Sequence, residues 1–291
     1  MRNSNQNMAH SQSKLTGDDT PLFRARASDF SMRNSRFLGE LSRAAYETNE
    51  TKLRSELANL DLIDCRLIED SETDTQVLVG STEQAIVVAF RGTEPTKLKD
   101  LLTDVELSMV PGPLGKVHEG FWESLEGIWP KLERAVDSRQ NGKRALWFTG
   151  HSLGGALAQL AVARLIQTGR PAQGLYSYGA PRCGNTRFAA EFNRIAGRST
   201  FRIVNEADII PDVAPKFLGF EHCGRFCQLD GRGRLLVDTP QKQGLLHLLE
   251  ETMEFLFDCE DDHSLAKGYL PKLSALVPWG KTPPAILRRA A

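Results

Sequence analysis

The spacing of hydrophobic positions changes near residue 33. Residues 1–32 are mostly polar and show no period, which predicts a loose N-terminal tail. From Phe37 onward, apolar residues recur at intervals of three and four, as they do along one face of an amphipathic helix. Two strand-like runs follow at 75–79 and 85–90. The second run is continuously apolar, as expected of a strand buried on both faces of a sheet.

Helical and strand-like patterns alternate along the next part of the chain. The expected helices cover 121–136, 154–165 and 186–195, and the expected strands cover 145–148, 174–178 and 200–204. This alternation predicts an α/β fold, in which a mostly parallel sheet carries helices on both faces. No internal repeat or linker interrupts the pattern, so we expect residues 33–291 to form one domain. After Pro215 the alternation ends, and we expect an irregular hairpin at 220–238 and a helix at 245–257.

One short motif carries candidate chemistry. The sequence GHSLG at 150–154 follows an apolar strand and opens a helix that is rich in small residues. A serine between glycines in a strand-turn-helix setting is typical of a nucleophile elbow. The first turn of such a helix also directs backbone N–H groups toward a developing oxyanion. A plain glycine-rich turn is the alternative, but this setting favours a serine hydrolase with the α/β-hydrolase fold and Ser152 as nucleophile.

A serine hydroxyl needs a base, and the base needs a carboxylate that orients it. In this fold the chain order is serine, acid, histidine. Three histidines follow Ser152: His247 falls in a leucine-rich helical pattern, and His222 lies in the expected hairpin beside two cysteines. His263 lies in a polar loop after the last helical pattern, where the base is expected.

Two carboxylates compete for the role of the acid. Asp208 and Asp212 both follow the strand expected at 200–204. Catalytic side chains of open α/β sheets come from loops at the carboxyl ends of strands. Asp208 is nearer to the end of the strand, and Asp212 lies behind Pro211 in the position of a turn or capping residue. We therefore favour Asp208.

Several blocks together resemble the class 3 lipases, the fungal-type triacylglycerol lipases. The blocks are AFRGT at 89–93, VHEGF at 117–121, GHSLGG at 150–155, NEADIIP at 205–211 and DH at 262–263. The resemblance implies a triad of Ser152, Asp208 and His263. It also implies an oxyanion hole formed by the backbone and hydroxyl of Thr93 and by the N–H of Leu153. It implies neither a metal nor an organic cofactor.

The same resemblance bears on three further segments. His118 could serve as a base, but it precedes the nucleophile and belongs to a block that is structural in the family. Residues 95–106 occupy the position of the family's lid, and their leucines fall on one helical face. A helix fixed to the core is the alternative, since this stretch lacks the tryptophan that is common in fungal lids. The helix expected at 245–257 has an acidic polar face, which favours core packing or a dimer contact over membrane binding.

Composition limits which binding partners and which cellular compartment we expect for this protein. The chain has 36 basic and 37 acidic residues and a net charge of -1, which gives no reason to expect nucleic acid. No apolar run is long enough for a transmembrane helix, and the N-terminus lacks a signal segment. The 5 cysteines are scattered, so we expect reduced thiols, with a Cys223–Cys227 bridge as the alternative. The acidic run at 260–262 lacks the spacing of a calcium loop. We expect a cytoplasmic protein, or a secreted one if the chain begins after its signal.

These observations lead to an expected function. We expect hydrolysis of the carboxylic esters of tri-, di- or monoacylglycerols, with an acyl or lipid substrate and a lipid-water interface as partners. The alternatives are a phospholipase A1, a soluble short-chain carboxylesterase, and a lipid-binding protein that keeps the fold without turnover.

Overall fold

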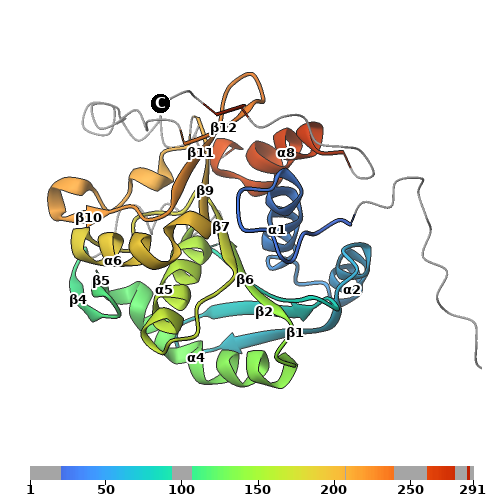
Figure 1. The fold of residues 1–291 in the computed structure, drawn as a ribbon, viewed down its shortest axis with the longest axis horizontal. Helices are drawn as coiled ribbons and strands as arrows, with labels where there is room; N and C mark the ends of the chain where they lie inside the picture. Colours follow the sequence, from blue (N-terminus) through green and yellow to red (C-terminus); the bar gives the residue numbers. More distant parts are fainter. Residues whose placement is uncertain (1–20, 94–106, 207, 239–260, 279–286, 289–291) are drawn as a thin grey trace, which may run out of the picture.

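The central element of the computed structural model is a mostly parallel sheet (Figure 1). The structure describes residues 21–93, 107–206, 208–238, 261–278 and 287–288. Within these residues the main sheet has 9 strands in the order β1-β2-β3-β6-β7-β9-β11-β12-β13. The strands are β1 Ile63–Asp70, β2 Thr75–Ser81, β3 Ala85–Phe90, β6 Ala145–His151, β7 Gly174–Tyr178, β9 Thr200–Asn205, β11 Arg225–Leu229, β12 Leu235–Val237 and β13 Leu287–Arg288. Strands β3, β6, β7, β9 and β11 are parallel, whereas β1, β2 and β12 join the sheet antiparallel.

Helices cover both faces of this sheet. They are α1 Met32–Ala44, α2 Glu50–Asn59, α4 Glu119–Arg139, α5 Leu153–Gln167, α6 Thr186–Ala196 and α8 Leu270–Leu276, with a π-helical turn η4 at Leu265–Tyr269 and 3-10 turns η1 Gly197–Ser199, η2 Ile210–Asp212 and η3 Lys216–Leu218. Helices α1, α2 and α8 contribute to the hydrophobic cluster on one face, and α4, α5 and α6 contribute to the cluster on the other. The predicted α/β-hydrolase architecture is therefore confirmed.

A small antiparallel sheet accompanies the main one. Its strands lie in the order β10-β8-β5-β4. They are β4 Met109–Gly112, β5 Gly115–His118, β8 Gly184–Asn185 and β10 Phe220–Glu221. Strand β8 comes between the end of β7 and the start of α6, so the small sheet lies at the edge where the parallel strands end.

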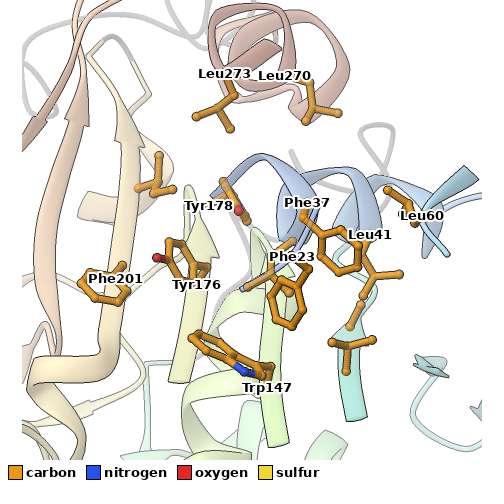
Figure 2. Close-up of a cluster of buried hydrophobic side chains, with 14 of the residues drawn as sticks. Phe23, Phe37, Leu41, Leu60, Trp147, Tyr176, Tyr178, Phe201, Leu270 and Leu273 are labelled. Carbon is orange, nitrogen blue, oxygen red and sulfur yellow. The ribbon is translucent and has the colours of Figure 1, made fainter. Parts of the chain in front are cut away.

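The central strands are buried along their whole length, as the unbroken apolar run of β3 predicts for that strand. Every residue of β3, β6, β7 and β9 is buried. Figure 2 shows Phe23 between Phe37 of α1 and Trp147 of β6, with Tyr176 of β7 near Trp147 and Leu273 of α8 above them. Burying a side chain of this size stabilises the fold by about 1.5–3 kcal/mol. These contacts hold the central strands, and the candidate site is built on the loops that follow their carboxyl ends.

The prediction of a loose tail is wrong for residues 21–32. Phe23 and Phe30 are buried, and the Phe23 ring stacks on Phe37 with centroids 4.6 Å apart. The indole N–H of Trp147 donates to the carbonyl oxygen of Ala25 at 2.9 Å, which ties this segment to β6. The segment is irregular, so its buried aromatic residues have no period that a sequence pattern could show. The remainder of the predicted tail, residues 1–20, lies outside the described residues.

Other predictions differ at the edges of the fold. The sequence patterns did not indicate α2 or β1; α2 buries Leu53 and Leu57, and β1 is an edge strand that is largely open to solvent. The hairpin expected at 220–238 is present as β11 and β12, and β11 also extends the main sheet beside β9. The lid expected at 95–106 and the helix expected at 245–257 lie outside the described residues, and the single domain over 33–291 stays a prediction. Within the described part, no helix is both long and apolar enough to cross a membrane.

Candidate active site

Ser152 lies at a sharp turn between β6 and α5. Its backbone has φ 56° and ψ −131°, a combination that a residue with a side chain rarely adopts. Two backbone hydrogen bonds hold the turn: the N–H of Ser152 donates to Tyr178 at 2.9 Å, and the N–H of Gly155 donates to Ser152 at 2.9 Å. The result is a side chain that projects from the end of the sheet at the first turn of a helix, as a nucleophile elbow requires.

The glycines of the motif are needed for space. A Cβ atom at Gly150 would collide with the backbone of Gly154, and one at Gly154 would collide with the carbonyl oxygen of Phe90. At Gly155, an added Cβ would lie 2.7 Å from the Cβ of Ala180. The elbow therefore packs directly against the ends of β3 and β7, which no larger residue at these positions would allow.

Asp208 and His263 form a buried pair. Asp208 follows β9, and His263 lies two residues before η4. The Nδ1 atom of His263 is 2.9 Å from Oδ2 and 3.0 Å from Oδ1 of Asp208. Since a carboxylate only accepts, Nδ1 carries the proton and Nε2 carries the lone pair. The pair is therefore oriented for a base that acts through Nε2.

Besides His263, two hydrogen-bond donors fix the carboxylate of Asp208. The N–H of Ile210 donates to Oδ1 at 2.9 Å, and the hydroxyl of Tyr269 donates to Oδ2 at 2.5 Å. Burial and the Asp208 charge raise the pKa of Tyr269 well above its ordinary value, so Tyr269 keeps its proton and remains a donor. Gly179, at φ +57°, leaves room on the other side, because a Cβ there would collide with Oδ2 of Asp208 and lie 3.0 Å from Nδ1 of His263.

The two atoms that would exchange a proton are the Oγ of Ser152 and the Nε2 of His263. Both are buried, and neither has a hydrogen-bond partner among the residues that the structure describes. The Oγ of Ser152 and the Nε2 of His263 are therefore both free to contact a substrate. Hydrogen bonds between catalytic groups often tighten only when substrate is bound.

His151 anchors the loop that carries His263. Its Nε2 donates to the carbonyl oxygen of His263 at 2.6 Å, and its Nδ1 accepts from the hydroxyl of Tyr46 at 2.9 Å. The two imidazole rings lie 4.5 Å apart between centroids. Burial, helped by the nearby His263, lowers the pKa of His151 well below its ordinary value, so the ring is neutral. In the sequence, His151 occupies only a variable position of the motif, and nothing in the motif reveals a partner as distant as Tyr46.

The expected oxyanion donors lie at the same edge of the sheet. Thr93 follows β3 and is half-buried, and Leu153 is the first residue of α5. Gly92 lies against the elbow: a Cβ there would collide with the carbonyl oxygen of His151 and lie 3.2 Å from the Cβ of Ser152. The chain between β3 and Thr93 therefore passes beside Ser152.

The other candidates for the acid and the base of the triad lie in different surroundings. Asp212 forms an ion pair at 2.8 Å with the buried guanidinium of Arg182. His118 caps α4 by accepting from the N–H of Phe121 at 3.4 Å, and burial lowers the pKa of His118 to about 4. Burial and the charge of Arg202 lower the pKa of His222 well below its ordinary value. His247 lies outside the described residues.

The alternative of a Cys223–Cys227 bridge is wrong. Cys223 belongs to the hydrophobic cluster on the α5 side of the sheet, and Cys227 belongs to the cluster on the α1 side. Both thiols are free, because the sheet itself lies between them. Within the described part of the chain, no group of three or more His, Cys, Asp or Glu residues is arranged to hold a metal ion.

Comparison with known proteins agrees with this geometry. The family model of the class 3 lipases matches residues 87–218, which include the elbow, Thr93 and Asp208. A lipase of Rhizomucor miehei is 33% identical over 186 residues, covering 57% of this chain and 51% of the relative. Secreted mono- and diacylglycerol lipase 1 of Fusarium solani is 32% identical over 183 residues, covering 56% of this chain and 54% of the relative. The chain thus spans about half the length of these curated relatives.

A solved structure extends the likeness over most of the fold. The triacylglyceride lipase of Rhizomucor miehei superposes with a TM-score of 0.65 at 25% identity, covering 80% of this chain and 94% of the other. Residues 87–218 are therefore similar to the class 3 lipases, and the chain has the α/β-hydrolase fold of the fungal lipases it superposes on.

Proposed function

We propose that this protein is a serine hydrolase that cleaves the ester bonds of acylglycerols through an acyl-enzyme. The observation that carries the proposal is the buried Asp208–His263 pair, at 2.9 Å, at the same edge of the sheet as the strained turn of Ser152. An elbow serine and an aspartate-oriented imidazole together supply a nucleophile and its general base.

The reaction begins with attack of the Ser152 Oγ on the acyl carbonyl carbon. The hydroxyl proton passes to Nε2 of His263, and Asp208 holds the Nδ1 proton and stabilises the imidazolium. The carbonyl oxygen, now an oxyanion, accepts from the N–H of Leu153 and from the backbone and hydroxyl of Thr93. As the tetrahedral intermediate collapses, the bond to the alkoxide breaks and His263 protonates the leaving alcohol.

Water then releases the acyl group. His263 removes a proton from the water, which attacks the acyl carbon, and the second tetrahedral intermediate returns the electron pair to Oγ of Ser152. The fatty acid leaves, and the serine regains its proton from His263. The fixed donors to Asp208 keep this cycle aligned, because Tyr269 and the N–H of Ile210 hold the carboxylate at both oxygens.

The names of the relatives support the substrate class. One acts, by its name, on mono- and diacylglycerols, and the superposed structure is that of a triacylglyceride lipase. The Fusarium relative is a secreted lipase, which supports secretion over a cytoplasmic location for this protein. The same chemistry would serve a phospholipase A1 or a short-chain carboxylesterase, so the head group and the chain length decide between them.

A substrate panel tests the proposal. We expect the purified protein to release fatty acid from mono-, di- and triacylglycerols faster than from phosphatidylcholine, and Ser152→Ala to release none from any of them. Faster release from phosphatidylcholine would favour the phospholipase. Activity confined to dissolved short esters would favour the carboxylesterase, and equal rates for both forms of the protein would contradict catalysis at Ser152.

A further inference from the structure

Exposed hydrophobic side chains are few and unevenly placed. Among the described residues, four large hydrophobic side chains are exposed: Ile63 at 52%, Ile195 at 42%, Phe217 at 70% and Leu218 at 46%. Single exposed hydrophobic residues are ordinary, but adjacent ones mark sites of interaction. Phe217 and Leu218 are adjacent, and Phe217 is the most exposed of the four. We call these two residues the apolar tip.

The apolar tip lies at the edge of the sheet that carries the candidate site. It ends η3 and runs through Gly219, at φ +87°, into β10. Strand β10 pairs with β8, which directly precedes α6 in the chain, and β10 lies beside α6 in Figure 1. A crossover helix begins where the preceding parallel strand ends, which is also the edge where Ser152 follows β6 and Asp208 follows β9. The tip and the candidate nucleophile therefore share one side of the molecule.

The two other exposed residues lie at the opposite edge. Ile63 begins β1, and its register partner Ser81 pairs with Ile86 near the start of β3. Ile195 lies in the last turn of α6, just before β9 begins. Both positions are at the edge where the parallel strands start. The only adjacent pair of exposed large hydrophobic residues in the described part is thus on the side of the site.

Hydrogen bonds from Arg182 hold the segment that leads into the apolar tip. The guanidinium of Arg182, which follows β7, donates to the carbonyl oxygens of Asp212 at 3.1 Å and Ala214 at 3.3 Å. Lys216, beside the tip, forms an ion pair with Glu221 at 3.1 Å. The positive charge of Lys216 is therefore balanced by the carboxylate of Glu221 in β10. With this charge balanced, we expect the apolar tip to bind a partner whose surface is uncharged and apolar rather than one that is charged.

We propose that the apolar tip, Phe217 and Leu218, inserts into the surface of neutral or zwitterionic lipid and holds the site edge of the protein against it. The inference rests on the proposed function, because an enzyme that cleaves insoluble esters must act where the lipid surface is. It adds a contact that chemistry at Ser152 does not require. Transfer of the exposed phenyl ring and leucine from water into lipid supplies the driving force.

Binding to vesicles tests the tip separately from catalysis. We would use the full chain with Ser152→Ala, so that no lipid is consumed, and measure flotation with phosphatidylcholine vesicles. Adding Phe217→Ser and Leu218→Ser should weaken partitioning about tenfold or more. The matched control, Ile63→Ser with Ile195→Ser, removes two exposed hydrophobic residues from the far edge and should change partitioning less than about twofold. Because the tip carries no unbalanced charge, raising the salt concentration should not release the protein.

Three results would overturn the inference. The first is vesicle binding that is absent, or that is unchanged by the tip substitutions. The second is an equal loss in the control variant. The third is a dimer of the unsubstituted protein that the tip substitutions dissociate in light scattering, which would make the tip a contact between two copies.

Hydrolysis of a dissolved short ester separates this inference from the proposed function. With Ser152 in place, the tip variant should hydrolyse such an ester at the rate of the unsubstituted protein, and its thermal unfolding should be unchanged. If the unsubstituted protein hydrolyses no ester, the proposed function fails, and the vesicle result alone still decides the tip.

Discussion

At the scale of single residues, the backbone of Ser152 is the clearest sign of function. A side chain in this part of φ/ψ space costs about 1–3 kcal/mol, and such strain persists only where the surrounding structure enforces it. Here the bond from Ser152 N–H to Tyr178 and the first turn of α5 enforce it. A turn without a chemical role could relax this strain with glycine at position 152.

The two candidate acids make a matched pair of variants. Asp208→Asn should lower kcat by about 10⁴-fold, because an amide no longer stabilises the imidazolium or selects the tautomer of His263. Asp212→Asn should leave the activity of the folded protein near normal and lower its stability, because Arg182 loses its ion pair. Ester hydrolysis per folded molecule and urea unfolding measure the two effects. Equal losses of kcat in two folded variants would remove the support for Asp208.

At the scale of elements, the turn after β7 sets the position of the Asp208–His263 pair. Gly179→Ala places a methyl group where Oδ2 of Asp208 lies, so we expect kcat to fall about 100-fold or more. Gly169→Ala is the matched control. Gly169 also has a positive φ, +72°, but nothing lies within 4 Å of an added Cβ. The control should lose about 1 kcal/mol of stability and keep its kcat. Similar kcat values in the two variants would contradict a role for the close approach.

The N-terminal segment behaves as part of the core and offers a second test at this scale. Phe23→Ala should lower the free energy of unfolding by about 3–5 kcal/mol, because the ring fills space between Phe37 and Trp147. Ser28→Ala, an exposed position in the same segment, should change it by less than about 0.5 kcal/mol. Urea unfolding of the two variants measures the difference, and a negligible effect of Phe23→Ala would restore the loose tail that the sequence pattern predicts.

At the scale of the whole molecule, three buried histidines link stability to pH. Burial lowers the pKa of His118 to about 4 and lowers those of His151 and His222 well below 6.5. In the unfolded chain each would titrate near 6.5, so the unfolded state takes up protons first as the pH falls. The stabilisation is therefore complete above the unfolded pKa and is lost as the pH drops below it.

Each of these histidines contributes up to about 1.4 kcal/mol per pH unit to the loss. We expect the free energy of unfolding, measured in urea, to fall steeply between pH 6.5 and 5. His118→Gln, which keeps an acceptor for the helix cap, should make the fall shallower by up to about 1.4 kcal/mol per unit. A stability that is flat across this range would contradict neutral burial of the three rings.

Much of the fold was predictable because its center is buried on both faces. The run of β3 and residues 145–148 of β6 contain no polar residue that could interrupt the apolar pattern, and the small residues of α5 allow close packing on the sheet. Elements at the edge, such as β1, mix exposed and buried positions, so their pattern is weak. Chain order and motif context were sufficient to select Ser152, Asp208 and His263, and their roles stay predictions.

The residues that hold the catalytic side chains in place could not be predicted in the same way. Tyr46, His151 and Tyr269 reach their partners across 105, 112 and 61 positions of sequence, so no local spacing reveals them. The alternative of a bridge between Cys223 and Cys227 is wrong for a related reason. Two cysteines four positions apart suggest proximity, but here the chain enters β11 between them and carries them to opposite faces of the sheet.

The most direct test of the central claim is reaction with a fluorophosphonate, which phosphonylates an activated serine and stays attached. We predict one adduct per molecule in the intact mass, located on Ser152 by peptide mapping, with loss of ester hydrolysis in proportion to labelling. Ser152→Ala should fold normally and take up no label. An unlabelled protein, a label on another serine, or continued labelling of Ser152→Ala would contradict the account.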